Sequence, residues 1–176
     1  MNEISNLIRT IPNYPKDGIM FRDITTLLKD PKGFQLTINL LKERYQNQKI
    51  DFIAGIEARG FILGAALSYA LGIGFIPVRK KGKLPGKTVS ETYQLEYGTD
   101  TIEIHEDAFF KGAKILLIDD LIATGGTALG AISLIEKIGG EIIETAFVVD
   151  LPELKGAEKI KNKGYKVFSL TQFDGH

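Results

Sequence analysis

Hydrophobic and polar positions along this chain follow two alternating periods. Short apolar runs indicate buried β-strands, and longer stretches with apolar residues at helical spacing separate them. The strands expected in this way are 50–56, 74–80, 114–119, 141–150 and 165–170. The intervening helices are expected at 59–72, 126–140 and 152–164. Strands that alternate with helices in this order predict an α/β fold with a mostly parallel central sheet flanked by helices.

The first 49 residues and one later segment depart from this alternation. Residues 2–9 indicate a short amphipathic helix, and "PKDGIMFRDIT" (15–25) indicates an irregular loop. Asp30 and Pro31 together are typical of a helix start, with apolar positions continuing at helical spacing to residue 45. Residues 93–106 alternate around "GTD", which predicts a β-hairpin inserted into the sheet.

Composition narrows the class of protein without identifying it. The chain has 176 residues, which suits one domain, 1–176. It carries 22 basic and 22 acidic residues, so no global charge attracts nucleic acid or a membrane surface. It has no cysteine and only His105 and His176, so thiolate and histidine zinc sites are not expected. No signal peptide or long apolar span is recognisable, and a cytoplasmic location is expected.

The most informative segment is "ILLIDDLIATGGT" (115–127), in which an apolar strand ends in two acids and a small-residue turn. A turn of small residues at a helix N-terminus offers backbone N–H groups and a favourable dipole to an anion. The segment lacks the lysine of a triphosphate loop and the glycine spacing of a dinucleotide loop. We expect a monophosphate to bind at Ala123, Thr124, Gly125, Gly126 and Thr127.

Two adjacent carboxylates would repel such a phosphate unless they faced another group. Asp119 and Asp120 could accept hydrogen bonds from vicinal sugar hydroxyls, or help to hold Mg²⁺ together with substrate phosphates. The alternative is that Asp120 merely caps the following helix and the glycines merely pack. Ligands of parallel α/β sheets bind at the carboxyl ends of the strands, where Arg59 and the loop after Arg79 are also expected.

Four stretches together resemble the type I phosphoribosyltransferases, and most closely the adenine-specific members of that family. They are "PKDGIMFRDIT", "GIEARGF", "RKKGKLPG" with "YQLEYG", and the acidic strand with its loop. They span residues 15–127 in the family's order. The resemblance implies an N-terminal hood over the base (1–30) and a flexible loop with the hairpin (80–106). It also implies that Asp119 and Asp120 bind the ribose hydroxyls and that 123–127 bind the 5′-phosphate.

Further roles follow from the resemblance, each with a simpler alternative. Glu96 is expected to manage the base proton, although strand alternation alone favours a solvated glutamate. Tyr97 is expected to close over the site or to pack in the hairpin. Arg59 is expected to bind pyrophosphate, rather than only pairing with Glu57. Arg79 and Lys83 are expected to belong to a pyrophosphate clamp, whereas an unspecific basic patch would be solvated.

The base site is expected in the hood. The resemblance implies that Phe21 stacks on the base and that main-chain groups of Met20 and Arg22 read its edge, whereas a core aromatic is the alternative for Phe21. Ala123 stands where 6-oxopurine enzymes of the family carry Asp, which favours adenine.

The implied reaction converts adenine and phosphoribosyl pyrophosphate to AMP and pyrophosphate, with Mg²⁺ as cofactor, in a homodimer. Two rivals remain open. One is the same chemistry on xanthine or orotate. The other is a regulator that senses phosphoribosyl pyrophosphate without catalysis. Such regulators usually add a DNA-binding domain, for which 176 residues are expected to leave no room.

Overall fold

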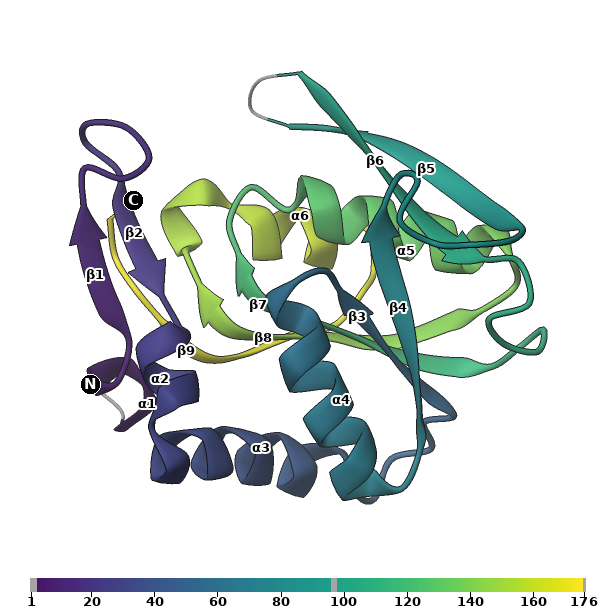
Figure 1. The fold of residues 1–176 in the computed structure, drawn as a ribbon, viewed down its shortest axis with the longest axis horizontal. Helices are drawn as coiled ribbons and strands as arrows, with labels where there is room; N and C mark the ends of the chain where they lie inside the picture. Colours follow the sequence, from purple (N-terminus) through teal and green to yellow (C-terminus); the bar gives the residue numbers. More distant parts are fainter. Residues whose placement is uncertain (1–2, 96–97, 176) are drawn as a thin grey trace.

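The structure, a computed structural model, describes residues 3–95 and 98–175, and in it two separate sheets are formed (Figure 1). The larger has seven strands in the order β5-β6-β4-β3-β7-β8-β9. Their bounds are β3 Phe52–Ile56, β4 Gly74–Lys80, β5 Thr88–Gln94, β6 Thr99–His105, β7 Lys114–Ile122, β8 Glu141–Asp150 and β9 Val167–Gln172. Strands β4, β3, β7, β8 and β9 are parallel to one another, and β6 is antiparallel to both β4 and β5. The predicted α/β fold with an inserted hairpin is confirmed.

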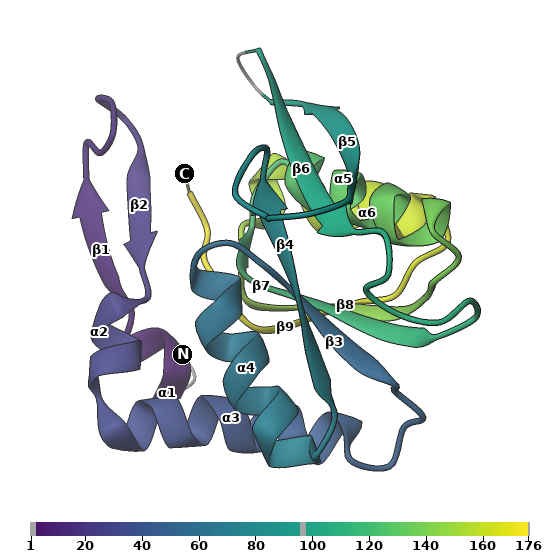
Figure 2. The ribbon, with the colours of Figure 1, turned by 45° about the vertical axis from the view of Figure 1, so that its right-hand side comes forward.

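Helices cover both faces of the large sheet (Figure 2). Helices α3 (Pro31–Tyr45) and α4 (Arg59–Leu71) contribute to one apolar core, whereas α5 (Gly126–Lys137) and α6 (Gly156–Asn162) contribute to the other. Alternate residues of β7 point into the two cores, since successive side chains of a strand face opposite ways. Within the described ranges, no helix combines the length and apolar character needed to cross a membrane.

Two predicted helix boundaries are confirmed by their local chemistry. The side chain of Asp30 accepts a hydrogen bond from the backbone N–H of Gly33 at 2.6 Å, and Pro31 occupies the first helical position of α3. Helix α4 ends at Gly72, whose φ of 69° is left-handed and suits glycine. These caps fix the ends of the two helices that support the site from one face of the sheet.

The N-terminal region is more regular than the sequence analysis expected. Helix α1 (Glu3–Asn6) is followed by β1 (Arg9–Pro12), which pairs antiparallel with β2 (Met20–Asp23), and then by helix α2 (Thr25–Lys29). The prediction of an irregular loop over 15–25 is therefore wrong for its second half. Four-residue strands show too little alternation to be recognised, and their pairing is a long-range contact.

Two further boundaries differ from the prediction. The helix expected over 152–164 is divided into a 3₁₀ turn, Pro152–Leu154, and α6, because Lys155 between them has a φ of 59°. Strand β7 does not end at the acidic pair but continues to Ile122, since Leu121 and Ile122 still pair with Val149 and Asp150 of β8. The acidic pair therefore lies within a strand, which determines where its carboxylates point.

Candidate active site

The loop that connects β7 to α5 forms one wall of a small pocket. Gly125 precedes the helix with a φ of 84°, and no side chain caps the helix N-terminus. The alternative that Asp120 caps this helix is therefore wrong. The pocket has a volume of about 110 Å³ and is lined by Asp119, Leu121, Ile122, Ala123, Thr124, Gly125, Gly126, Thr127, Ala128 and Phe147. All five residues of the predicted phosphate loop thus face one cavity at the start of a helix.

Backbone packing holds this loop on two sides. A Cβ atom on Gly156, at the start of α6, would lie 2.2 Å from the carbonyl oxygen of Ala123. A Cβ atom on Gly126 would lie 2.4 Å from the carbonyl oxygen of Gln94 in the hairpin. Real Cβ atoms do not approach backbone so closely, so glycine is required at both positions. The loop is therefore wedged between α6 and the hairpin.

The two acids point to opposite faces of β7. Asp119 lines the small pocket, and its Oδ1 accepts a hydrogen bond from the backbone N–H of Asp120 at 2.8 Å. Asp120 is buried on the other face, where its carboxylate pairs with Arg59. Burial, and next the charge of Asp120, raise the pKa of Asp119 well above its ordinary value. The pair is thus split into one carboxylate beside the loop and one beside a guanidinium.

Arg59 reaches Asp120 because α4 begins directly against β7. A Cβ atom on Gly60 would lie 2.9 Å from the carbonyl oxygen of Ile118, so the first turn of the helix touches the strand. Burial tends to lower the pKa of Arg59, but the hydrogen bond and charge of Asp120 outweigh it and raise that pKa. The simpler alternative, a pair with Glu57, is wrong for this residue.

Glu57 instead holds the end of β4. Its carboxylate accepts hydrogen bonds from the backbone N–H of Lys80 and, at 3.5 Å, from the guanidinium of Arg79. Arg79 also donates to the carbonyl oxygen of Lys83 at 3.3 Å and lies 5.8 Å from the ring of Phe61. Arg79 is thus placed near the start of α4, whereas Lys83 is exposed on the loop that follows.

A second pocket lies under the two-stranded sheet. Its volume is about 290 Å³, and its lining residues are Ile11, Tyr14, Phe21, Arg22, Asp23, Ile24, Thr25 and Arg59. The rings of Tyr14 and Phe21 meet edge to face with centroids 5.2 Å apart. Phe21 is half-buried at this pocket, so the alternative of a fully buried core aromatic does not apply. Met20 is exposed and its side chain does not line the pocket.

Asp23 was not predicted as a site residue, although it stands in a quoted motif. Its buried carboxylate accepts hydrogen bonds from Arg9 Nε at 3.1 Å and from the N–H and hydroxyl of Thr25 at 2.9 and 2.8 Å. Burial alone would raise its pKa, but the hydrogen bonds from Arg9 and Thr25 lower it to about 2. Asp23 therefore joins β1, β2 and α2 at the edge of the pocket.

Glu96 and Tyr97 lie outside the described residues, so their predicted roles stay predictions. The strand that leads to them is anchored. Tyr93 is 7% exposed, and a Cβ atom on Gly130 of α5 would lie 2.9 Å from its ring. The described ranges contain no group of three or more His, Cys, Asp or Glu residues arranged to hold a metal. A metal here would need oxygen ligands from the substrate, and Asp119 is the carboxylate that lines the pocket.

Comparison with known proteins agrees with this geometry. A model of the phosphoribosyl transferase domain matches residues 23–175. Adenine phosphoribosyltransferase from Chlorobium luteolum is 66% identical over 174 residues, 98% of each chain. The crystal structure of adenine phosphoribosyltransferase from Rhodothermus marinus has a TM-score of 0.90 at 48% identity, over 97% of this chain and 96% of that chain. The Saccharomyces cerevisiae enzyme, complexed with an imino-altritol bisphosphate and adenine, has a TM-score of 0.89 at 41% identity, over 96% of each.

The fold is that of a phosphoribosyltransferase, and the chain belongs to that family. Within the family it falls among the adenine phosphoribosyltransferases, with which it aligns over nearly its whole length. The resemblance recognised in the sequence is confirmed.

Proposed function

We propose that this chain transfers the 5-phosphoribosyl group of phosphoribosyl pyrophosphate to N9 of adenine, giving AMP and pyrophosphate. One observation carries the proposal. Arg59 lines the pocket under the two-stranded sheet, called the hood pocket below, and also pairs with Asp120, which lies three residues before Ala123 at the start of the phosphate loop. A base in the hood pocket and a phosphate at the loop would therefore sit at the two ends of one continuous site. The adenine held by the Saccharomyces relative supports the choice of base.

The hood is suited to a flat, neutral ring. Phe21 offers an aromatic face, and aromatic rings stack favourably on such surfaces. Strand β2 belongs to a two-stranded sheet, so one of its edges carries unpaired main-chain groups. Figure 1 shows that β2, rather than β1, faces the body of the molecule. Main-chain donors and acceptors of Met20 and Arg22 on this edge would distinguish an amino group from a keto group.

The sugar phosphate would lie along β7 and its loop. Backbone N–H groups of residues 123–127 would bind the 5′-phosphate at the N-terminus of α5. Asp119, which lines the pocket, would accept a hydrogen bond from a ribose hydroxyl. Asp120 would act through Arg59, because its carboxylate is already paired there.

The leaving group would be stabilised by cations. Arg59 at the start of α4 and Arg79 nearby would bind the pyrophosphate, with Lys83 approaching from the exposed loop. Mg²⁺, bound mainly by substrate oxygens and by Asp119, would neutralise developing charge on the pyrophosphate. In the reaction the N9–C1 bond forms as the C1–O bond to pyrophosphate breaks. Glu96 would take up the ring proton, and Tyr97 would help to close the site.

A homodimer is part of this proposal. Helix α4 leaves Ile62 and Tyr69 45% and 91% exposed, with exposed Ala65 between them on the same face. An apolar face of this kind on the helix that carries Arg59 suits contact with a second copy of the chain. Such contact would let the basic loop of one subunit approach the site of the other. The cytoplasmic location expected from the sequence stays a prediction.

The test is a parallel assay of pyrophosphate release with adenine, hypoxanthine, guanine, xanthine and orotate, in the presence of Mg²⁺ and phosphoribosyl pyrophosphate. We expect turnover with adenine alone. Turnover with a different base would contradict the choice of base and keep the phosphoribosyl chemistry. Binding of the sugar donor without turnover on any base would contradict the enzymatic assignment and favour the sensor.

Glu96 can be tested separately by Glu96→Ala, with Glu106→Ala as a control at an exposed position after the same hairpin. We expect kcat to fall by about 10²–10⁴-fold for the first variant, as for loss of general acid–base help, and to stay unchanged for the second. Wild-type rates in Glu96→Ala would remove its assigned role.

A further inference from the structure

A groove lies beside the phosphate loop, next to the small pocket. It has a volume of about 570 Å³ and runs between the hairpin, α5 and α6. Thr124 and Gly126 line both this groove and the pocket. The loop thus borders both cavities. Lys159 of α6 and Lys163, the residue that follows the helix, also line the groove.

One of these lysines is bonded to the loop itself. The ammonium group of Lys159 donates to the carbonyl oxygen of Thr124 at 3.0 Å. Leu129 donates its N–H to the carbonyl oxygen of Gly125 at 2.9 Å, so the hydrogen bonds of α5 begin one residue later. The Thr124 carbonyl therefore lies outside the ladder of the helix, and the lysine satisfies it.

The orientation of this carbonyl has a consequence for the next peptide N–H. In a trans peptide the C=O of one residue and the N–H of the next point in opposite directions. Because Lys159 draws the Thr124 carbonyl toward the groove, the N–H of Gly125 is turned away from the groove. Gly125 lines the small pocket and does not line the groove. The lysine also places a positive charge behind a loop that would receive an anion.

We propose that Lys159 is a positioning residue for the 5′-phosphate, acting through the Thr124 carbonyl. This inference rests on the proposed function, because it assumes that the loop binds the phosphate of AMP and of the sugar donor. Lys159 does not touch the substrate. It sets the direction of a loop peptide and adds to the local positive potential. Its loss should weaken ligands that carry the 5′-phosphate and leave the hood pocket unaffected.

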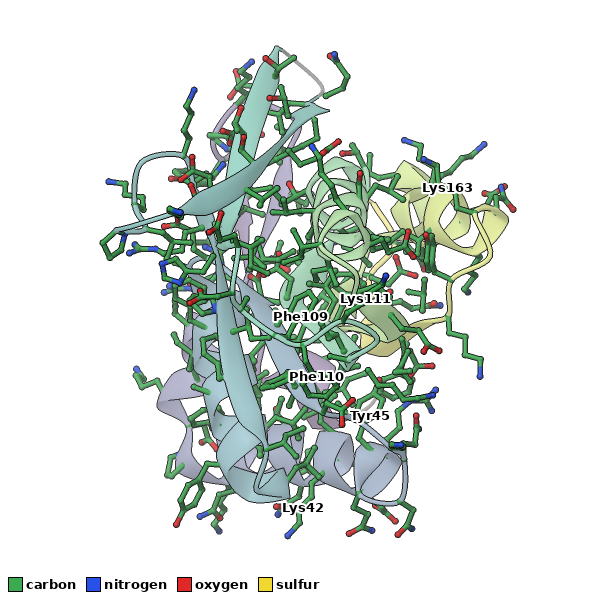
Figure 3. All side chains as sticks on the ribbon, turned by 90° about the vertical axis from the view of Figure 1, so that its right-hand side faces the viewer. Lys42, Tyr45, Phe109, Phe110, Lys111 and Lys163 are labelled. Carbon is green, nitrogen blue, oxygen red and sulfur yellow. The ribbon has the colours of Figure 1, made fainter. Side chains whose placement is uncertain are left out.

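Lys163 provides a matched control. It lies four residues beyond Lys159, lines the same groove and is labelled at the end of α6 in Figure 3. Within the described part of the chain its ammonium group bonds to no loop carbonyl. Lys159→Met removes charge and donor while keeping the aliphatic stem, Lys159→Arg keeps both, and Lys163→Met removes a charge from the same groove.

The experiment measures the Kd of AMP by calorimetry and the KM of adenine by initial rates for all four proteins. For Lys159→Met we expect the Kd of AMP to rise about 5- to 20-fold, as for one charge-assisted hydrogen bond. We expect the KM of adenine to stay within twofold, Lys159→Arg to restore the affinity for AMP, and Lys163→Met to resemble wild type.

Three results would overturn the inference. They are an unchanged Kd of AMP in Lys159→Met, an equal loss in Lys163→Met, or an equal rise in the KM of adenine. An equal loss in Lys163→Met would indicate a general effect of charge in the groove. An equal rise in the KM of adenine would indicate a defect of the whole protein. Failure of the proposed function is distinguishable, because wild-type protein would then show neither turnover of adenine nor binding of AMP.

Discussion

The phosphate loop and the hood are built by opposite means. Backbone contacts wedge the loop between α6 and the hairpin, at distances that only glycine permits at positions 126 and 156. The hood is a separate two-stranded sheet, and side chains such as Arg9, Asp23 and Arg22 hold it in place. The proposed site for the sugar phosphate is thus part of the central fold, whereas the proposed site for the base is attached to it by side chains. Substitutions that move the loop should therefore reduce activity strongly, whereas substitutions in the hood should have smaller effects.

The largest effect is expected from Gly156→Ala. The added Cβ would overlap the carbonyl oxygen of Ala123, so the loop or α6 must shift. Because misplacement by about 1 Å can cost 10²-fold in rate, we expect kcat/KM for the sugar donor to fall at least about 100-fold. Steady-state kinetics with Glu158→Ala, an exposed position on the same helix, provides the comparison. Near-normal kinetics in Gly156→Ala would show that the loop tolerates movement, and the contrast between the loop and the hood would then not hold.

A smaller effect is expected from Asp120→Asn, at the junction of the two regions. The substitution leaves Arg59 without its carboxylate partner. Because Arg59 is 47% exposed and solvent screens the pair, we expect a loss of about 1–2 kcal/mol, which corresponds to roughly 5- to 30-fold in kcat/KM. The same kinetics on Asp107→Asn, at an exposed turn, controls for loss of a charge. If Asp120→Asn altered only the KM of adenine, the Arg59–Asp120 pair would support the hood alone and would not connect it to the phosphate loop.

The stability that the hood contributes should depend on pH through Asp23. Its folded pKa of about 2 lies below the ordinary value of 3.8, so its ionisation stabilises the folded state above about pH 4, and this contribution is lost as pH falls toward 2. The contribution is at most about 2 kcal/mol, because Arg9 is 55% exposed and solvent screens the pair. We expect denaturant unfolding of wild type and Asp23→Asn to differ at pH 6 and to converge near pH 2. A difference that did not depend on pH would contradict this assignment.

The smallest effect is expected from Phe173→Ala, at the outer attachment of the hood. The guanidinium of Arg22 lies 4.5 Å from the centre of the Phe173 ring. Loss of a cation–π contact at an exposed site is worth about 0.5–1 kcal/mol, so the KM of adenine should rise about two- to fivefold. The KM of the sugar donor, measured in parallel, should not change. An equal change in both constants would show that the hood is coupled to the loop.

The parts of the fold that follow from local pattern were predictable from the sequence. The five parallel strands, helix α4 with its glycine end and helix α3 with its Asp-Pro start all have signals within a few residues. The β1–β2 pair was missed because its strands are four residues long and pair across an intervening loop. The extension of β7 past the acidic pair was missed because it depends on pairing with β8.

In the candidate site too, features with a local sequence signal were predictable, whereas those that depend on long-range contacts were not. The residues of the phosphate loop were recognised because their types follow one another along the chain, and the structure gathers all of them around one pocket. Lys159 was not recognised, because its bond to Thr124 joins positions 35 residues apart and a lysine on a short helix is otherwise unremarkable. The pair between Arg59 and Asp120 was not predicted either, because the two residues are near each other only in the fold.

The attachment of Arg22 to the C-terminal segment bears on the order in which the protein matures during synthesis. Arg22 donates to the main-chain oxygen of Asp174 at 2.9 Å and stacks over Phe173. The hood strands are translated before the segment that fastens them. A ribosome-bound nascent chain that still holds residues 173–174 in the exit tunnel therefore has its N-terminal strands without this anchor. The hood can be fastened to the body of the fold only after these two residues have left the tunnel.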